Sequence, residues 1–160
     1  MKIVLMSDTH TDRQSVFRIR DSYPDADYVV HCGDILMPAE ILEGITAVAG
    51  NCDLPGYLPF EQTIQAGQFR ILVKHGHDLF RGYAPDYRNV ARYAKQHGYN
   101  AVFFGHSHMY YDGTIDGIRL LNPGSVSRSR DFEPGSYMIV TVEGDSLKAE
   151  RKNAVELMFQ

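Results

Sequence analysis

The chain has 160 residues, of which 44% are hydrophobic and 22% are charged, and its formal net charge is −4. This length and composition are typical of a globular protein with a sizeable apolar core, so we expect residues 1–160 to form a single domain. A mildly acidic chain without a basic run gives no strong signal for nucleic acid and none for a membrane surface.

The apolar run at the N-terminus is too short for a signal peptide. No apolar run approaches the roughly 20 residues that span a bilayer. We therefore expect a cytoplasmic protein without a membrane partner. The two cysteines, Cys32 and Cys52, lack the spacing of a zinc site and are too few for a disulfide framework, which predicts two reduced thiols.

Short, nearly continuous apolar runs predict five buried strands. They cover residues 3–6, 28–30, 45–49, 69–73 and 101–104. Helices are predicted from Asp12 to Ser22, from Met37 to Glu43, and from Asp86 up to a left-handed cap at Gly98. Pro38 is expected in the first turn of the second helix.

Turn signals predict three hairpins. Asp116-Gly117 separates residues 113–115 from 118–121, Glu143-Gly-Asp145 separates 137–142 from 146–150, and Gln65–Gln68 suggests the third. Parallel strands in the first half and antiparallel pairs in the second fit an α/β fold of two packed mixed sheets flanked by helices.

Each of the five predicted buried strands runs into a polar motif. In chain order these are Ser7-Asp-Thr-His10, His31-Cys-Gly-Asp34, Gly50-Asn-Cys-Asp53, Lys74-His-Gly-His77 and Gly105-His-Ser-His108. Ligands of α/β sheets bind beyond the carboxyl ends of strands. Aspartate, asparagine and histidine side chains suit divalent transition ions. In an extended chain, side chains two residues apart would point into one cleft, as for Asp8 with His10.

Each motif alone also has a structural interpretation. Gly-Asp and Gly-Asn-x-Asp sequences are ordinary turns, and His31 is predicted to be a hydrogen-bonded histidine near the core. A metal site is favoured because five separate strand ends all carry side chains that bind metals.

The ordered set Asp-x-His, Gly-Asp, Gly-Asn, His and Gly-His-x-His resembles the calcineurin-like metallophosphoesterases, in particular their compact single-domain phosphodiesterase branch. The resemblance runs from Ile3 to about Ser125 and includes the segment Leu121–Val126. It implies a four-layer α/β sandwich that holds two divalent metal ions. Manganese is the expected ion, with nickel, iron and zinc as alternatives.

The resemblance also implies a ligand set. One ion would bind Asp8, His10 and His108, and the other Asn51, His75 and His106, with Asp34 bridging both. Asp34, Asn51 and His75 are implied as catalytic residues as well. His106 and His108 would then bind different ions, while the intervening Ser107 is expected to point away and to tolerate alanine.

The implied activity is hydrolysis of a small phosphodiester by in-line attack of a hydroxide that bridges the two ions. Such a centre stays cationic, which favours a phosphate ester. Two alternatives remain open at this stage. One is a phosphomonoesterase with the same centre. The other is a non-catalytic metal-binding scaffold, because the small subunit of the retromer trafficking complex resembles this fold.

One position departs from the resemblance. Many such enzymes have a histidine after Gly-Asn that is thought to assist the leaving group, and Cys52 occupies that position. We therefore expect a steep dependence of rate on leaving-group acidity. Candidate substrate contacts are Cys52, Asp53, His77, Arg13 and Arg128. Apolar surface on the C-terminal hairpins suggests a possible homo-oligomer.

Overall fold

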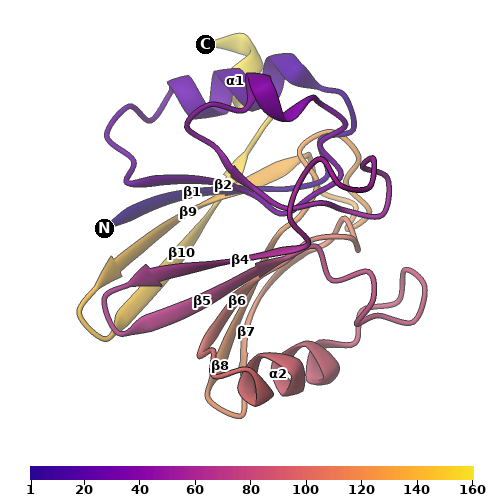
Figure 1. The fold of residues 1–160 in the computed structure, drawn as a ribbon. Coiled ribbons are helices and arrows are strands. Elements are labelled where there is room, and N and C mark those ends of the chain that lie inside the picture. The colour runs from indigo at the N-terminus through magenta and orange to yellow at the C-terminus, as the bar shows by residue number, and fades with distance from the viewer.

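Two five-stranded sheets pack face to face in the computed structural model, which describes all of residues 1–160 (Figure 1). The first sheet has the order β10-β9-β1-β2-β3, with β1 at Lys2–Met6, β2 at Tyr28–His31, β3 at Thr46–Ala47, β9 at Ser136–Glu143 and β10 at Ser146–Asn153. The second has the order β4-β5-β6-β8-β7, with β4 at Glu61–Ala66, β5 at Phe69–Lys74, β6 at Ala101–Phe103, β7 at Tyr110–Ile115 and β8 at Ile118–Pro123.

Helices cover the two outer faces, which confirms the predicted four-layer α/β sandwich (Figure 1). Helix α1 (Arg13–Asp21) lies on the first sheet and α2 (Tyr87–Gln96) on the second. Both begin as predicted, because the carboxylates of Asp12 and Asp86 each accept a hydrogen bond from a backbone N–H of the first turn. Two short 3₁₀ helices, η1 (Ala39–Ile41) and η2 (Glu156–Phe159), complete the chain.

The strands that precede the polar motifs run parallel within each sheet. Strand β1 pairs parallel with β2, and β2 with β3. Strand β5 pairs parallel with β6. Their carboxyl ends therefore meet at one edge of the sandwich, to the right in Figure 1. The three predicted hairpins are present as β4–β5, β7–β8 and β9–β10.

The buried strands pack on both faces. On β1, Ile3 and Leu5 belong to the core between the sheets, while Val4 and Met6 pack beneath α1. On β6, Phe103 lies between the sheets and Val102 faces α2. Continuous apolar runs are therefore required, because each successive side chain enters a different core.

Two predicted elements are shorter than expected. Strand β3 covers two residues instead of 45–49, because the backbone N–H of Ala49 bonds to the carbonyl of Pro59 and the chain turns away. The helix expected at 37–43 is only the single turn η1, with Pro38 preceding it rather than inside it. Gly44, at φ 77°, ends that turn.

Two surface properties bear on partners. No helix in the molecule combines the length and the apolarity that crossing a bilayer requires. The exposed large hydrophobic side chains include none on the β9–β10 hairpin. Apolar surface was predicted on the C-terminal hairpins, and on β9–β10 the large apolar side chains face the two cores.

The inter-sheet core predicts a large stability difference between two phenylalanines. Phe103 is 0% exposed and Phe132 is 105% exposed. Phe103→Ala should lower the free energy of unfolding by about 3–5 kcal/mol, whereas Phe132→Ala should change it by less than about 0.5 kcal/mol. Urea denaturation measures both values. Equal effects would contradict the described core.

Candidate metal centre

Seven candidate ligands converge where the carboxyl ends of the two sheets meet. Those that follow strands of the first sheet are Asp8, His10, Asp34 and Asn51, and those that follow strands of the second are His75, His106 and His108. The structure therefore brings together every residue that was predicted as a metal ligand. All except His10 and Asn51 are buried.

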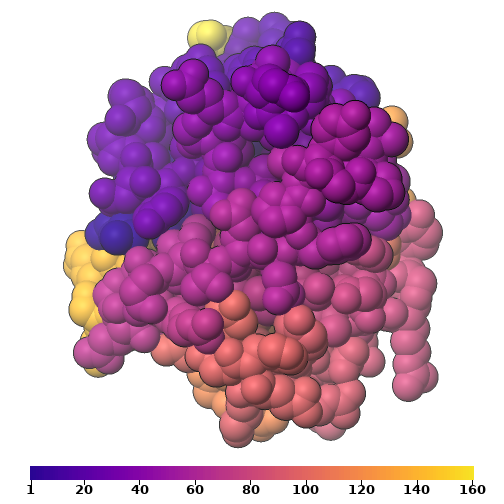
Figure 2. Space-filling model, viewed as in Figure 1, coloured from indigo at the N-terminus to yellow at the C-terminus, as the bar shows by residue number.

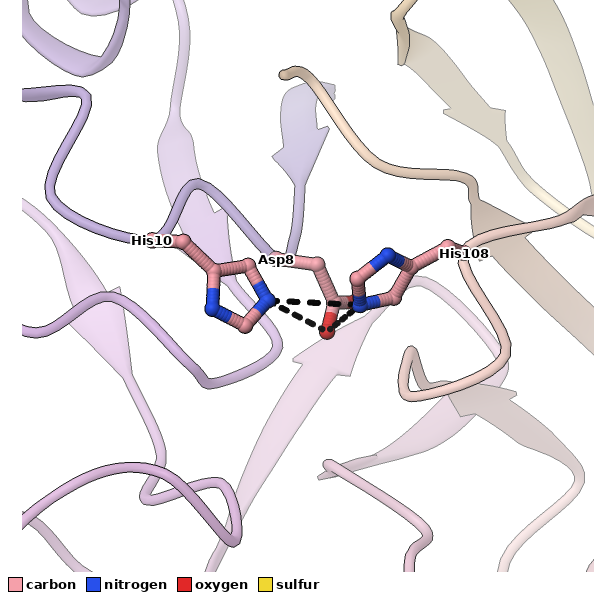
Figure 3. Close-up of side chains that lie close together, drawn as sticks. All are labelled: Asp8, His10 and His108. Carbon is pink, nitrogen blue, oxygen red and sulfur yellow. Dashed lines mark hydrogen bonds and ion pairs between the residues drawn. The ribbon is translucent and has the colours of Figure 1, made fainter. Parts of the chain in front are cut away.

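The first group of ligand atoms surrounds Asp8 Oδ1 (Figure 3). His108 Nε2 lies 3.2 Å from this oxygen and 3.3 Å from His10 Nε2. His10 Nε2 is 3.9 Å from Asp8 Oδ1 and also 3.9 Å from Asp34 Oδ2. Two nitrogens and a carboxylate oxygen thus face one point, with Asp34 at its border.

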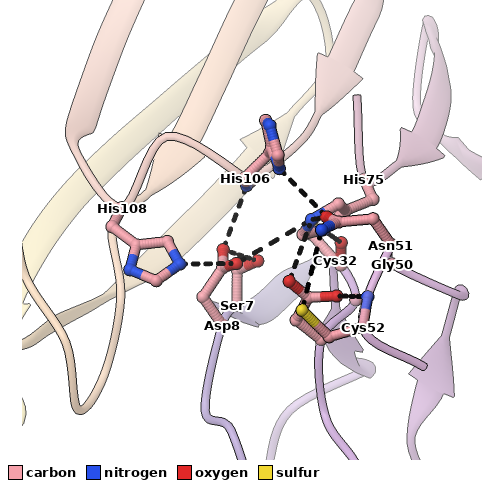
Figure 4. A network of polar contacts seen from close by, with 12 residues as sticks. Ser7, Asp8, Cys32, Gly50, Asn51, Cys52, His75, His106 and His108 are labelled. Carbon is pink, nitrogen blue, oxygen red and sulfur yellow. Dashed lines mark hydrogen bonds and ion pairs between the residues drawn. The ribbon is translucent and has the colours of Figure 1, made fainter. Parts of the chain in front are cut away.

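The second group surrounds Asn51 Oδ1 (Figure 4). This amide oxygen lies 3.0 Å from His75 Nε2 and 3.1 Å from His106 Nδ1. His75 Nε2 is also 3.4 Å from Asp34 Oδ2. The Asp34 carboxylate therefore lies between the two groups, in the position of a bridge.

Backbone carbonyls determine which nitrogen each ring offers. His75 Nδ1 lies 2.7 Å from the Cys32 carbonyl, His106 Nε2 lies 2.8 Å from that of Gly82, and His108 Nδ1 lies 2.8 Å from that of Arg128. A carbonyl only accepts, so each of these nitrogens carries the proton and donates. In a neutral ring the opposite nitrogen is then unprotonated, and its lone pair points into the cluster.

This arrangement fits cations. When His75 and His106 are neutral, Asn51 Oδ1 faces two lone-pair nitrogens, and the buried Asp8 Oδ1 has no hydrogen-bond donor. Acceptors that face acceptors are costly unless a positive charge lies between them. Ligand atoms held about 2.1 Å from an ion lie roughly 3.0–3.4 Å apart at octahedral or tetrahedral angles. The contacts of His75, His106 and His108 fall in that range, whereas His10 Nε2 lies 3.9 Å from two carboxylate oxygens.

The electrostatics of the carboxylates agree with this interpretation. Burial by itself would raise the pKa of Asp34, but the neighbouring His75 in its protonated form and a hydrogen bond from the Cys52 N–H hold that pKa well below its usual range. A cation in the cluster would take the place of this second proton of His75. Burial opposes ionisation of Asp8 too, yet its contact with His108 and the charge of His75 lower its pKa. Both carboxylates are therefore ionised at neutral pH and available as ligands.

The ligand loops have a strained backbone. Asp8, His10, Asp34, His106 and His108 all have φ between 44° and 72°. Non-glycine residues adopt this left-handed region rarely, and clusters of them mark functional sites. The prediction that Asp8 and His10 point into one cleft is correct, but the reason given for it, an extended chain, is wrong. They share a cleft because left-handed residues curl the loop.

Several supporting residues were not predicted from the sequence. Ser7 Oγ donates to Asp8 Oδ2 at 2.6 Å, and the His106 N–H donates to the same oxygen at 3.1 Å, which leaves Oδ1 free. Ser125 Oγ donates to the Asp8 carbonyl and Asn122 Nδ2 to the Gly105 carbonyl. The segment Leu121–Val126 contains the last two residues and is the only signal that could have identified them.

Ser107 is more constrained than expected. It is 2% exposed, and its hydroxyl accepts hydrogen bonds from Asn122 Nδ2 and from the Met109 N–H. Its side chain does turn away from the ligand atoms. It is nevertheless a buried hydrogen-bonded group, so alanine at this position removes two acceptor contacts.

Asp53 supports the loops and has no free oxygen. Its carboxylate accepts four backbone N–H groups, two of them from Asp34 and Gly50 at 2.7 and 2.8 Å. The other two come from Ile35 and Leu36. The loops after β2 and β3 are thereby joined through one side chain. Asp53 was predicted as a substrate contact, and its carboxylate oxygens are taken up by the ligand loops.

Cys52 lies at the mouth of the centre. Its Sγ is within 4.8 Å of ligand atoms of His10 and Asp34, and its backbone N–H donates to Asp34 Oδ1 at 2.8 Å. Burial, together with the charge of Asp34, raises the pKa of the Cys52 thiol to about 11. The thiol is therefore neutral at physiological pH.

The other predicted substrate contacts differ in position. His77 has its ring 5.5 Å from that of His75 and 6.1 Å from that of His106, so it lines the cleft. The backbone carbonyl of Arg128 accepts a hydrogen bond from His108 Nδ1 at 2.8 Å, which places this residue beside the first group. Arg13 is exposed at the start of α1 and makes no side-chain contact with the centre.

Two further residues frame the cleft. The Tyr83 ring stacks on His106 with 5.0 Å between centroids, and the guanidinium of Arg130 lies 4.5 Å from the centroid of Tyr83. His31, in contrast, is buried and hydrogen-bonded to Thr9 and to the Gly33 N–H, and burial lowers its pKa to about 4. The prediction that His31 is a satisfied core histidine is confirmed.

With this geometry established, comparison with known proteins is informative. The calcineurin-like phosphoesterase superfamily domain matches residues 1–145. The chain belongs to this family. A probable metallophosphoesterase of Bacillus subtilis, YsnB, is 33% identical over 149 residues, which cover 91% of this chain and 87% of that protein. By family, the chain is thus a metal-dependent phosphoesterase.

Solved structures show how widely the fold is used. A predicted phosphoesterase from Streptococcus pneumoniae is 27% identical, with a TM-score of 0.87 over 96% of this chain and 90% of that one. Vps29 of Entamoeba histolytica in complex with zinc is 24% identical, with a TM-score of 0.75 over 96% of this chain and 99% of that one. The second likeness concerns the fold alone.

The position of Asp53 generates a prediction. Asp53→Asn replaces a carboxylate oxygen that accepts two N–H groups with an NH₂ donor, so two buried donors lose their acceptor. The free energy of unfolding of the chelated protein should fall by about 2–3 kcal/mol in urea titrations. Asp145→Asn, in an exposed turn, is the matched control and should leave stability unchanged. Equal stability of the two variants would refute the supporting role.

Proposed function

We propose that the protein hydrolyses phosphodiesters at a dinuclear metal centre. The observation that carries this proposal is the placement of Asp34 Oδ2 between two groups of lone pairs, one around Asp8 Oδ1 and one around Asn51 Oδ1. One group holds His10 and His108, and the other holds His75 and His106. Two separate groups with a shared carboxylate are what a pair of neighbouring ions requires.

When bound, two divalent transition ions would supply positive charge to the phosphate oxygens and would lower the pKa of a water molecule until it is a nucleophile at neutral pH. The residues of the chain supply the rest. Asp34, Asn51 and His75 set the spacing of the two groups. Hydrogen bonds to backbone carbonyls fix the tautomers of His75, His106 and His108. The lone pair of each ring therefore points toward its own ligand group. We propose manganese as the ion, with nickel, iron or zinc as alternatives.

Charge around the centre favours a diester over a monoester. Beyond the ligands, the cleft is lined by neutral groups, namely the Cys52 thiol and the rings of His77 and Tyr83. Of the nearby arginines, Arg130 already faces the ring of Tyr83 and Arg13 makes no side-chain contact with the centre, which leaves Arg128, beside the first group, as the one cation close to the phosphate. A singly charged diester needs less added positive charge than a doubly charged monoester.

A non-catalytic scaffold of the same fold is the alternative. Its fold would be the same, so only the chemistry of the centre separates the two. The complete set of unprotonated ligand atoms favours the enzyme, because a scaffold has no need for strained loops that aim lone pairs into an open cleft.

The proposal predicts distinct effects along Gly105–His108. His106→Ala and His108→Ala should each reduce the metal content by one ion and lower hydrolysis of bis-p-nitrophenyl phosphate by at least about 100-fold. Ser107→Ala should keep both ions and most activity, but lose about 1–2 kcal/mol of stability. Elemental analysis, steady-state kinetics and urea denaturation measure these quantities.

Two results would contradict the proposal. If the wild-type protein binds two ions but hydrolyses neither bis-p-nitrophenyl phosphate nor p-nitrophenyl phosphate with manganese, nickel, zinc or iron, the scaffold is correct. If Ser107→Ala loses as much metal as the histidine variants, the alternating assignment of His106 and His108 is incorrect.

The neutral thiol at Cys52 generates a second prediction. A thiol is a poor proton donor to an alkoxide, so the rate should fall steeply as the leaving group becomes less acidic. Cys52→His should flatten this dependence by supplying an imidazolium donor, whereas Cys52→Ser should leave it steep. Rates for a series of substituted phenyl methyl phosphates give the slope. A flat slope in the wild type would show that another group protonates the leaving oxygen.

A further inference from the structure

The exposed apolar side chains are not scattered over the surface. Ten large hydrophobic residues are exposed, and four of them lie at the chain termini: Met1, Val155, Met158 and Phe159. The remaining six all lie in loops at the edge that holds the metal centre: Leu36, Leu54, Tyr57, Phe60, Tyr83 and Phe132. Such a concentration beside a site indicates a binding function for the surface.

Part of this surface forms a pocket. A cavity of about 360 Å³ lies between the loop after β2 and the loop after β3. Its apolar wall consists of Leu36, Met37, Pro38, Leu54, Tyr57 and Leu58. This volume is within the range of small-molecule sites and accommodates one aromatic ring system. The loop of residues 50–60 that forms one wall belongs to the face shown in Figure 2.

The pocket is directly joined to the metal centre. Asp53 forms part of its lining, and the same carboxylate accepts the backbone N–H of Asp34 at 2.7 Å and of Leu36 at 2.8 Å. Leu36 is two residues beyond the bridging ligand, and Leu54 is two residues beyond Cys52 at the mouth of the centre. The pocket and the centre therefore share one rigid pair of loops.

The pocket offers no charge to a ligand. Asp53 is its one ionisable lining group apart from the phenol of Tyr57, and both Asp53 oxygens are occupied by four backbone N–H groups. No lysine or arginine lines it. An occupant gains by burying apolar surface, while a charged or sugar-like group would lose hydration without compensation.

We propose that this pocket binds an uncharged aromatic ester group of the substrate, so that the protein prefers aryl phosphodiesters to simple alkyl ones. The inference rests on the proposed phosphodiesterase function, because it assumes that the phosphate lies at the metal centre. The phosphate then sits beside Asp34, and one ester substituent extends over Leu36 and Leu54 into the pocket.

Binding tests the pocket independently of turnover. Leucine and methionine methyl signals of the zinc-loaded protein are followed by NMR during titration with benzyl(methyl)phosphinate, which cannot be hydrolysed because P–C bonds replace both ester bonds. The signals of Met37, Leu54 and Leu58 should shift with this probe. Dimethyl phosphate, which carries the same charge without a ring, should leave them unchanged. The same three residues should still shift when the titration is repeated on the chelated protein, because the pocket does not depend on metal. The shifts should be weaker, because the anionic group of the probe no longer has an ion to bind.

Kinetics tests the preference. Methyl p-nitrophenyl phosphate and phenyl p-nitrophenyl phosphate share a leaving group and differ only in the second ester group. The phenyl compound should have a kcat/KM about tenfold higher, which corresponds to burying roughly 55 Å² of apolar surface. Leu54→Ala and Tyr57→Ala should reduce this ratio to about 3 or less without changing the rate of the methyl compound.

Phe132→Ala is the control, because Phe132 is also an exposed apolar residue at the same edge but lies outside the pocket. It should keep the tenfold ratio. If neither diester is hydrolysed but the methyl signals shift, the proposed function fails and the pocket stands. Absence of shifts with benzyl(methyl)phosphinate overturns the pocket. Shifts that appear on concentrating the free protein would also overturn it, since the surface would then bind a second copy of the chain.

Discussion

The geometry of the centre depends on three hydrogen bonds from imidazole rings to backbone carbonyls. The carbonyls of Cys32, Gly82 and Arg128 each accept one hydrogen bond, from His75, His106 and His108 respectively. These bonds fix the tautomers and aim three lone pairs inward, where Asn51 Oδ1 and the donorless Asp8 Oδ1 already lie. A cluster made only of acceptors is stable when cations neutralise it, so the fold has prepared the site in advance of the ion.

Holding acceptors together in this way requires loops that resist relaxation. Five of the seven candidate ligands have a left-handed backbone, which costs energy at every non-glycine position. The hydrogen bonds that oppose this cost come from neighbouring loops, with Asp53 beneath the loops after β2 and β3 and Ser125 beneath Asp8. Glycines permit the close approach, since a Cβ at Gly50 would overlap the Asp34 carboxylate and one at Gly105 would overlap Ser7.

The sequence predicted the strands and the position of the centre well, for a simple reason. Buried parallel strands are almost wholly apolar, so the polar residues that end them, such as Asp8 and His106, are conspicuous, and parallel strands end at one edge. The left-handed loops could not be predicted, because the residue types Asp, His and Leu do not indicate that φ is positive. The role of Asp53 was missed because its partners are backbone groups, which every residue possesses. Tyr83 was missed because its contact with His106 joins residues 23 positions apart in the sequence.

Each group of candidate ligands draws on both sheets. Asp8 and His10 from the first sheet meet His108 from the second, and Asn51 from the first meets His75 and His106 from the second. The protein sheets are otherwise held together chiefly by their apolar core. An ion that bridges them binds only the assembled sandwich, and at a free concentration 100 times its dissociation constant it would add about 2.7 kcal/mol to the stability of the fold. The supply of metal would then affect the lifetime of the folded protein as well as its rate of catalysis.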